Sequence, residues 1–204
     1  MRYAGARWMN GAFLGRSMDV KGTAFLARKT MIEREFGAQR FAAVIREACG
    51  RDPSFATAIL ATSKIPIEAF LRFNEIIVRD PFRGDEQSYF RFGEASAVWA
   101  LGPDGPYRRL VTDRGVAELA ASAPAIYRNY FDHGEARSEM RSPTEVRLCI
   151  VGIDAPYRPV YFEYAVMGYF KRGLEMVSGK TVEMSADKAF SKGDDESVYT
   201  FSIV

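Results

Sequence analysis

The spacing of apolar residues predicts helices through the first two thirds of the chain. A stripe of Phe25, Ile32 and Phe36 ends at Gly37, a residue typical of helix C-caps. The same helical period recurs in later segments, which are separated by glycine, proline and polar turns. We expect these segments at about residues 41–50, 52–60, 67–78, 90–101, 116–121 and 125–131.

Three residues mark details of this helical region. Asp52 before Pro53 is typical of an N-cap followed by a first-turn proline. Asn74 is the one polar exception on the apolar stripe of residues 67–78. Pro124 is expected to separate the last two helical pieces, because proline inside a helix removes a backbone hydrogen bond.

The period changes from helical to alternating after Gly134. Apolar residues occupy every second position at 146–150, and residues 135–141 are expected to pair with them through a turn at Ser142 and Pro143. A helix from about 160 to 177 follows, ended by Gly179, and then a hairpin of residues 182–186 and 199–203. The pattern therefore predicts an α+β fold, in which N-terminal helices precede a hairpin, a helix and a second hairpin that form an antiparallel sheet of about four strands.

Length and charge bound the organisation of the chain. Its 204 residues suffice for one compact domain, which we place at residues 19–204. A basic arm, residues 1–18, precedes it, because the first acidic residue is Asp19. We expect a loosely ordered arm; contact with anionic lipid or with a partner is the alternative. No apolar run is long enough to span a membrane. The two widely spaced cysteines are typical of reduced thiols, which favours a cytoplasmic protein. The net charge of +2 gives no general case for nucleic acid.

The sequence contains no pattern typical of a catalytic nucleophile or a calcium-binding loop. Cys49 and Cys149 lie far apart and lack any signature of an activated nucleophile, so we expect two inert thiols and no disulfide. His133 is the single histidine and permits one catalytic dyad at most. The acidic run 194–196 lacks the spacing of a calcium loop and indicates a solvated turn. We therefore expect no enzymatic activity.

Several short motifs, taken in order, resemble those of a known superfamily. They resemble 4-vinyl-reductase-like domains and haem nitric-oxide-binding domains, and look most similar to an uncharacterised bacterial family abundant in myxobacteria. The motifs are Val20–Gly22, Phe25, Leu26 and Arg34–Gly37 at the front, and Tyr161–Tyr164, Met167–Tyr169, Gly179–Lys180 and Lys188–Phe201 at the back. The resemblance covers about residues 19–204.

The resemblance implies a site for metal or haem in some members, and the residues here argue against both. Metal-binding members carry cysteines where this chain has Ala189 and Ser197, and Phe162 or its neighbours replace a further cysteine. Alanine and phenylalanine supply no lone pair to zinc. Haem-binding members use a histidine ligand and a Tyr-x-Ser-x-Arg clamp. Here His133 ends a helix, where it favours a capping or surface role, and residues 135–141 lack the tyrosine and the spacing of the clamp. We expect no cofactor and no metal.

Two classes of function remain. The resemblance implies either a regulatory module that binds a small apolar or aromatic ligand and signals to a protein partner or a homodimer, or an assembly subunit with a filled core, as in trafficking complexes. The candidate ligand-binding residues are Trp99, Tyr127, Tyr130, Phe162, Met167 and Tyr169. The alternative for all six is that they only fill the core. Arg108, Arg109 and Arg128 are candidates for an anion or acidic-partner surface, or simply solvated charges. A cavity of about 300 Å³ or more would favour ligand binding, and a filled core with a large apolar surface patch would favour assembly.

Overall fold

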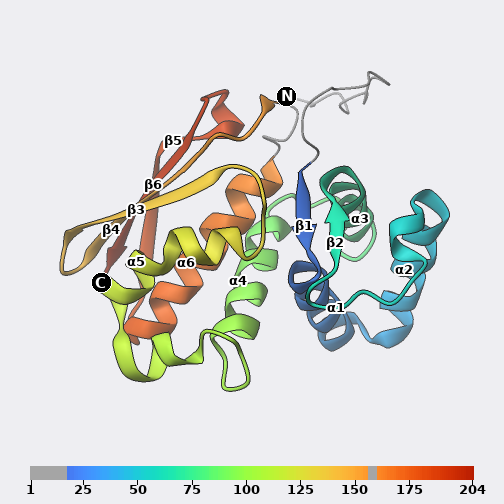
Figure 1. Cartoon of the computed structure of the whole chain (residues 1–204), viewed down its shortest axis with the longest axis horizontal. Helices are drawn as coiled ribbons and strands as arrows, with labels where there is room; N and C mark the ends of the chain where they lie inside the picture. Colours follow the sequence, from blue (N-terminus) through green and yellow to red (C-terminus); the bar gives the residue numbers. More distant parts are fainter. Residues whose placement is uncertain (1–17, 156–159) are drawn as a thin grey trace.

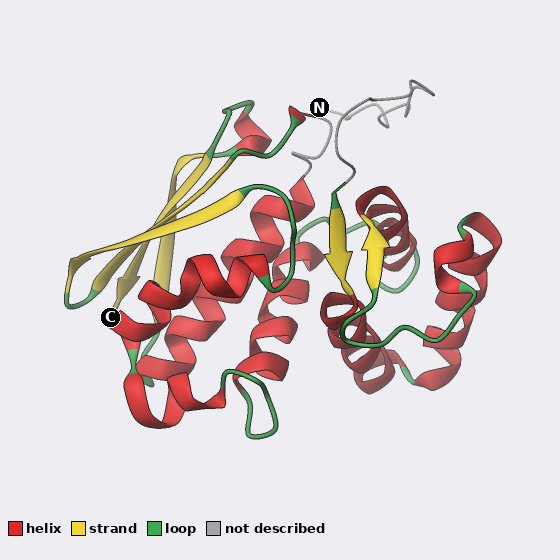
Figure 2. Cartoon of the chain, in the orientation of Figure 1, coloured by secondary structure: helices red, strands yellow, loops and turns green. Residues whose placement is uncertain are grey.

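The computed structural model of the chain describes residues 18–155 and 160–204. A four-stranded antiparallel sheet has helices packed on one face, and a helical half lies beyond them (Figures 1 and 2). Helices α5 (Val116–Arg128) and α6 (Val160–Ser178) contact the sheet directly, α4 (Ser88–Leu101) packs against α6, and α1 (Gly22–Phe36) packs against α4. We call the elements from β1 to α3 the N-terminal half and those from α4 to β6 the C-terminal half (Figure 1). The two halves meet where α1 packs against α4, which in turn packs against α6.

The helices confirm most of the sequence prediction. Their bounds are α1 Gly22–Phe36, α2 Ala38–Arg51, α3 Ile67–Arg79, α4 Ser88–Leu101, α5 Val116–Arg128 and α6 Val160–Ser178. Gly37 follows α1 with a φ of 85°, as expected of a residue that ends a helix. The Asp52 carboxylate accepts a hydrogen bond from the Ser54 backbone N–H at 3.0 Å and so caps a helix, but that helix is a single 3₁₀ turn, Pro53–Phe55, rather than a segment that reaches residue 60.

The prediction of two separate helices around Pro124 is wrong, because α5 runs through the proline. Proline has no N–H, so the carbonyl oxygen of Ala120 loses its helical donor. The Ser138 hydroxyl donates a hydrogen bond to that carbonyl from the neighbouring strand. The sheet thus supplies the bond that the helix lacks, and the helix continues.

The main sheet agrees with the predicted hairpin, helix and hairpin. Its strands are β3 Glu135–Ser142, β4 Glu145–Val151, β5 Val182–Lys188 and β6 Ser197–Ile203, in the order β3-β4-β6-β5. The two hairpins join through β4 and β6, where Leu148 pairs with Tyr199 and Val146 pairs with Phe201. These four side chains are buried, so the apolar face of the sheet faces the helices.

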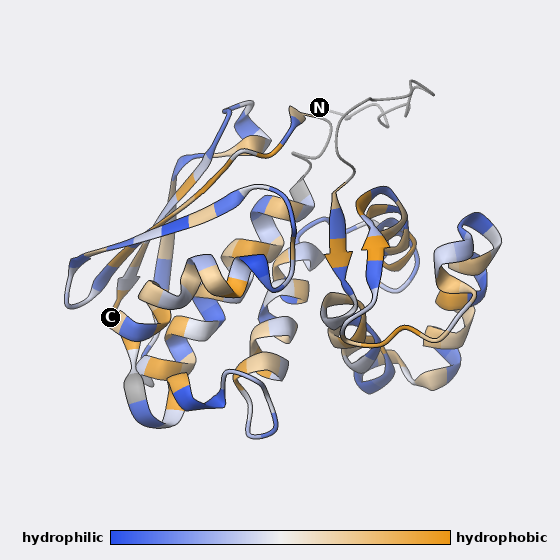
Figure 3. Ribbon diagram, in the orientation of Figure 1, coloured by the Kyte–Doolittle hydropathy of each residue, from blue (hydrophilic) through white to orange (hydrophobic). Residues whose placement is uncertain are grey.

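A second, two-stranded sheet was not predicted. It pairs β1, Asp19–Lys21, with β2, Lys64–Pro66. Its central residues, Val20 and Ile65, are buried. Figure 3 shows hydrophobic colouring in the middle of both strands. Three residues are too few to display an alternating period, so helical spacing nearby masked the strands.

Met18 and Ile67 lie far apart in the sequence but belong to the same hydrophobic core. Met18 is fully buried and its carbonyl accepts a hydrogen bond from the Ile67 N–H at 2.9 Å.

Residues 1–17 of the predicted basic arm lie outside the described residues, so the division at residues 18 and 19 stays a prediction. Within the part of the chain that is described, none of the helices has the length and apolar character of a membrane span.

Helices α4 and α6 approach closely because each carries a glycine at the contact. A Cβ added at Gly93 would lie 2.0 Å from the Ala165 carbonyl oxygen, and one added at Gly168 would lie 2.3 Å from the Phe90 carbonyl oxygen. Real Cβ atoms do not approach backbone so closely, so only glycine permits this helix spacing.

Replacing Gly168 with alanine is expected to lower the free energy of unfolding by about 1–3 kcal/mol, because the helices must move apart. Gly50, an exposed residue of α2, is a matched control, since a Cβ there meets no atom within 4 Å. Gly50→Ala should be neutral or stabilise by up to about 1 kcal/mol. Urea denaturation of the two variants measures both effects, and equal stabilities would refute the close-packing argument.

Candidate functional site

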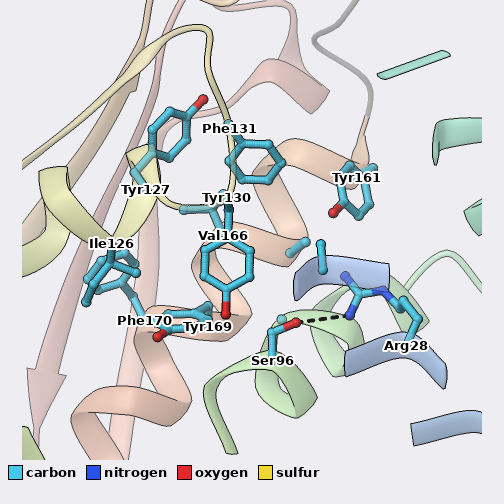
Figure 4. Close-up of a pocket in the computed structure, with 13 residues that line it drawn as sticks. Arg28, Ser96, Ile126, Tyr127, Tyr130, Phe131, Tyr161, Val166, Tyr169 and Phe170 are labelled. Carbon is cyan, nitrogen blue, oxygen red and sulfur yellow. Dashed lines mark hydrogen bonds between the residues drawn. The ribbon is translucent and has the colours of Figure 1, made fainter. Parts of the chain in front are cut away.

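A small cavity lies where the two halves of the chain meet (Figure 4). Its volume is about 40 Å³, which is room for a few atoms of a ligand or for a few water molecules. Residues from α1, α4, α5 and α6, and from the turn after α5, surround it. They are Ala24, Arg28, Gly93, Ser96, Ile126, Tyr127, Tyr130, Phe131, Tyr161, Ala165, Val166, Tyr169 and Phe170.

One face of helix α6 forms a wall of the cavity. Tyr161, Ala165 and Tyr169 are four residues apart and so share one face of the helix, with Val166 and Phe170 beside them. The opposite wall includes Tyr130 and Phe131, which strand β1 holds in place. The Tyr130 carbonyl accepts a hydrogen bond from the Lys21 N–H at 2.9 Å, and Val20 forms a β-bridge with Phe131.

Arg28 brings a positive charge into this buried region. Its side chain is 1 % exposed and its guanidinium lies 4.5 Å from the centre of the Phe92 ring. The hydrogen-bond acceptors around it are neutral, namely the Asn74 amide oxygen at 3.3 Å, the Phe92 carbonyl oxygen at 2.5 Å and the Ser96 hydroxyl at 3.2 Å.

No ion pair joins Arg28 to an acidic side chain of the described residues. Burial therefore lowers the pKa of the Arg28 guanidinium from its usual value, and nearby tyrosine hydroxyls, Tyr161 first, oppose that shift only in part. Buried charges in proteins are almost always paired with an opposite charge. Arg28 is an exception within the described structure.

Two tyrosine hydroxyls in the cavity wall also lack a partner. The hydroxyls of Tyr130 and Tyr169 are buried and neither has a hydrogen bond of good geometry among the described residues, although their rings meet edge to face at 5.7 Å. The Tyr127 hydroxyl differs, because it donates to the His133 carbonyl oxygen at 2.9 Å. Burial raises the pKa of Tyr130 and of Tyr169, so both phenols keep their protons and remain donors.

The six predicted ligand-binding residues divide into two groups. Tyr127, Tyr130 and Tyr169 line the cavity. Phe162 and Met167 are fully buried in the core and Trp99 is half-buried, and none of these three lines it. Phe162 packs directly behind the wall, against the rings of Phe131 and Tyr161, so apolar content alone does not separate lining residues from core residues. Arg108, Arg109 and Arg128 are exposed to solvent.

Arg28 was not predicted as a site residue, and it is the one charged residue among the described residues that line the cavity. The sequence feature that could have indicated Arg28 is its position on the apolar stripe of α1, three residues after Phe25 and four before Ile32. A charged residue at such a position faces the core. Asn74 was the corresponding polar exception on the stripe of α3. The structure joins these two exceptions, since the Arg28 Nε donates to the Asn74 oxygen and the Asn74 amide donates to the Phe70 carbonyl oxygen at 2.9 Å.

The residues present do not fit a haem. Cofactor sites typically enclose about 300–1000 Å³, several times the volume found here. His133 does not line the cavity, and its Nε2 lies 3.3 Å from the Asp154 carboxylate. Arg137 pairs with Glu135 and Arg141 pairs with Glu139 on the outer strand β3, so neither is directed to an anionic group in the cavity.

The other candidate sites are ordinary structure. Ala189 and Ser197 are buried, and the described residues contain no group of three or more histidine, cysteine or acidic side chains arranged for a metal. The Asp194 carboxylate accepts a hydrogen bond from the Ala189 N–H at 2.8 Å, as in a solvated turn.

Cys49 and Cys149 are both free of a disulfide. Cys49 donates to the Phe55 carbonyl oxygen at 3.0 Å. Burial, and then the Glu196 carboxylate, raise the pKa of Cys149 to about 11. A thiol with so high a pKa is a poor nucleophile at neutral pH, which agrees with the inert thiol expected at this position.

Comparison with known proteins gives matches in structure alone. No family model matches the chain, and no curated protein is significantly similar to it in sequence. An H-NOX protein from S. oneidensis, solved in the Fe(II)NO ligation state, superposes with a TM-score of 0.68 at 11% identity over 90% of this chain and 99% of its own. The unliganded Fe(II) H-NOX protein from K. algicida gives 0.65 at 12% identity over 90% and 96%.

These matches decide between the two parts of the resemblance. They support its haem nitric-oxide-binding part, whereas no comparison supports the 4-vinyl-reductase-like or myxobacterial part. The superpositions cover nearly the whole length of each chain, so the matched structures share the α+β architecture described above. At these low sequence identities the similarity concerns the backbone fold. The chemistry of the cavity must therefore be derived from the residues of this chain. The chain has the H-NOX fold.

Proposed function

We propose that the chain is a non-enzymatic regulatory module that binds a small ligand in the cavity between its two halves and works without haem or metal. The observation that carries the proposal is the set of unpaired polar groups in the cavity wall, which α1, α4, α5 and α6 contribute. The volume of about 40 Å³ does not meet the expectation of a cavity of about 300 Å³ or more, so the proposal concerns only a very small ligand. The structural neighbours include H-NOX proteins solved with and without a ligand on iron, so this fold is known to house a ligand in those proteins.

The position of the cavity suggests how occupancy would be signalled. Tyr130 lines the cavity and is tied through its backbone to β1 of the N-terminal half, while Tyr169 belongs to α6 beneath the sheet. A ligand that contacts both would favour one packing of the two halves over another, and so would shift the population of conformers. A protein partner or a second copy of the chain would respond to that shift.

The cavity narrows the choice of ligand. An engineered cavity of about 150 Å³ accommodates benzene, so 40 Å³ is too small for the aromatic ligand expected from the sequence. A ligand of a few heavy atoms fits.

The assembly alternative gains from the nearly filled core but not from the surface. The large apolar side chains that are exposed on the described residues, Phe36, Leu60, Val98 and Val204, come one each from α1, a loop, α4 and the C-terminus. Scattered single residues are ordinary on protein surfaces.

Haem content tests the proposal. The chain should be produced in cells supplied with a haem precursor, and the purified protein assayed by pyridine haemochrome absorbance. We expect haem far below one per chain, because the cavity is small and His133 lies outside its wall. A stoichiometric haem that is lost in His133→Ala would contradict the proposal.

A further inference from the structure

We propose that the cavity binds a small carboxylate or oxyanion of three or four heavy atoms, paired with Arg28. This inference rests on the proposed ligand-binding function and specifies the chemistry of its ligand. The charge, the hydrogen-bond donors and the volume of the cavity each lead to it separately.

The first argument is charge. Arg28 is buried, and the groups to which it donates are the neutral oxygens of Asn74, Phe92 and Ser96. Taking a cation out of water is costly unless an opposite charge accompanies it. A bound anion beside Arg28 would supply the negative charge that no described side chain provides.

The second argument is the balance of donors and acceptors. The hydroxyls of Tyr130 and Tyr169 lie near each other, but neither makes a hydrogen bond of good geometry with a described residue. Figure 4 shows the Tyr130 ring extending from its backbone with its hydroxyl end toward Tyr169 and Ser96. Ser96, by contrast, already donates to the Phe92 carbonyl oxygen at 2.9 Å. A tyrosine hydroxyl both donates and accepts, whereas the Arg28 guanidinium only donates. An anion suits this set, because it accepts from the guanidinium and from both hydroxyls at once.

The third argument is size and surroundings. About 40 Å³ admits formate, acetate or nitrate but not a larger acid. The rest of the wall is apolar, with Ile126, Phe131 and Val166 among its members, so a charge-assisted hydrogen bond there would be strengthened by the low dielectric. Arg28 lines the cavity, with the Phe92 ring 4.5 Å from its guanidinium and the Tyr161 hydroxyl nearby.

Calorimetric titration of the whole chain tests this inference. The probes are sodium formate, acetate and nitrate, with formamide and acetamide as neutral isosteres, at an ionic strength held constant with gluconate, which is too large for the cavity. We expect at least one of the three anions to bind and the isosteres to bind at least about tenfold more weakly, because a charged partner contributes more than a neutral one.

Variants assign the binding to this cavity. Arg28→Met should abolish anion binding, and Tyr130→Phe or Tyr169→Phe should each weaken it by about tenfold, since each removes one hydroxyl donor and keeps the ring. Tyr127→Phe is the matched control, because its hydroxyl is already bonded to the His133 carbonyl, and it should leave the affinity unchanged. If Arg28→Met does not fold, the two phenylalanine variants and their control still decide the question.

Three results would overturn the inference. If formamide or acetamide binds as well as its anion, the cavity takes a ligand but does not select an anion, and the proposed function survives. If Tyr130→Phe and Tyr169→Phe both bind the anion as tightly as the unchanged protein does, the anion binds elsewhere and not between these hydroxyls. If neither the anions nor the isosteres bind, the inference fails together with the proposed ligand-binding function.

Discussion

Phe162→Ala is expected to lower the free energy of unfolding by about 3–5 kcal/mol, because it removes a fully buried aromatic side chain from the centre of the core. The ring of Phe162 lies 4.8 Å from that of Phe131 and 5.5 Å from that of Tyr161. It does not line the cavity, so the loss should appear in the urea midpoint.

A phenylalanine at the protein surface provides the control for this variant. Phe36 is 39% exposed at the end of α1 and meets the Phe82 ring at 5.2 Å. Phe36→Ala should cost no more than about 1–2 kcal/mol, in line with its partial burial. Should Phe162→Ala prove as mild as Phe36→Ala, the assignment of Phe162 to the core would be wrong.

Replacing Glu163 should lower the free energy of unfolding by a similar amount to Phe162→Ala, because it removes buried hydrogen bonds. This carboxylate is 1% exposed and accepts three hydrogen bonds, from the Ser191 N–H at 2.8 Å, the Ser191 hydroxyl at 3.0 Å and the Tyr199 hydroxyl at 2.5 Å. It joins the first turn of α6 to the turn between β5 and β6. Glu163→Ala leaves these donors unpaired in the interior, at a cost of about 3 kcal/mol or more.

Glu163→Gln tests whether the carboxylate itself is needed. An amide keeps the shape but offers one oxygen and one NH₂ group to three donors, so we expect most of the loss to remain. Glu175→Gln, on the same helix, is the control, because Glu175 pairs with Lys171 and Arg172 near the surface and should cost less than about 1 kcal/mol. Equal effects at the two positions in urea denaturation would rule out a special role for Glu163.

The fold was largely predictable from hydrophobic period. The hairpin, helix and hairpin from β3 to β6 followed from alternation at residues 146–150 and 199–203 and from the stripe of α6. Features that depend on distant partners were not predictable. Helix α5 continues through Pro124 only because Ser138 serves the freed carbonyl, and β1 forms only because residues 64–66 pair with it.

The candidate site was predictable in part. Three of its tyrosines were chosen from aromatic content, but the same criterion chose Trp99, Phe162 and Met167, which do not line the cavity. The charge of Arg28 was missed because a single polar residue on an apolar stripe is normally attributed to the edge of the stripe. Its meaning emerges only when Arg28 and Asn74 are seen to meet across two helices.

A crystal structure of the chain grown in formate tests most directly whether the cavity is an anion site without haem. The account predicts planar density for one formate ion between Arg28 and the hydroxyls of Tyr130 and Tyr169, with the guanidinium unchanged in position. Density for water alone at saturating formate, or a porphyrin between α5 and α6, would contradict it.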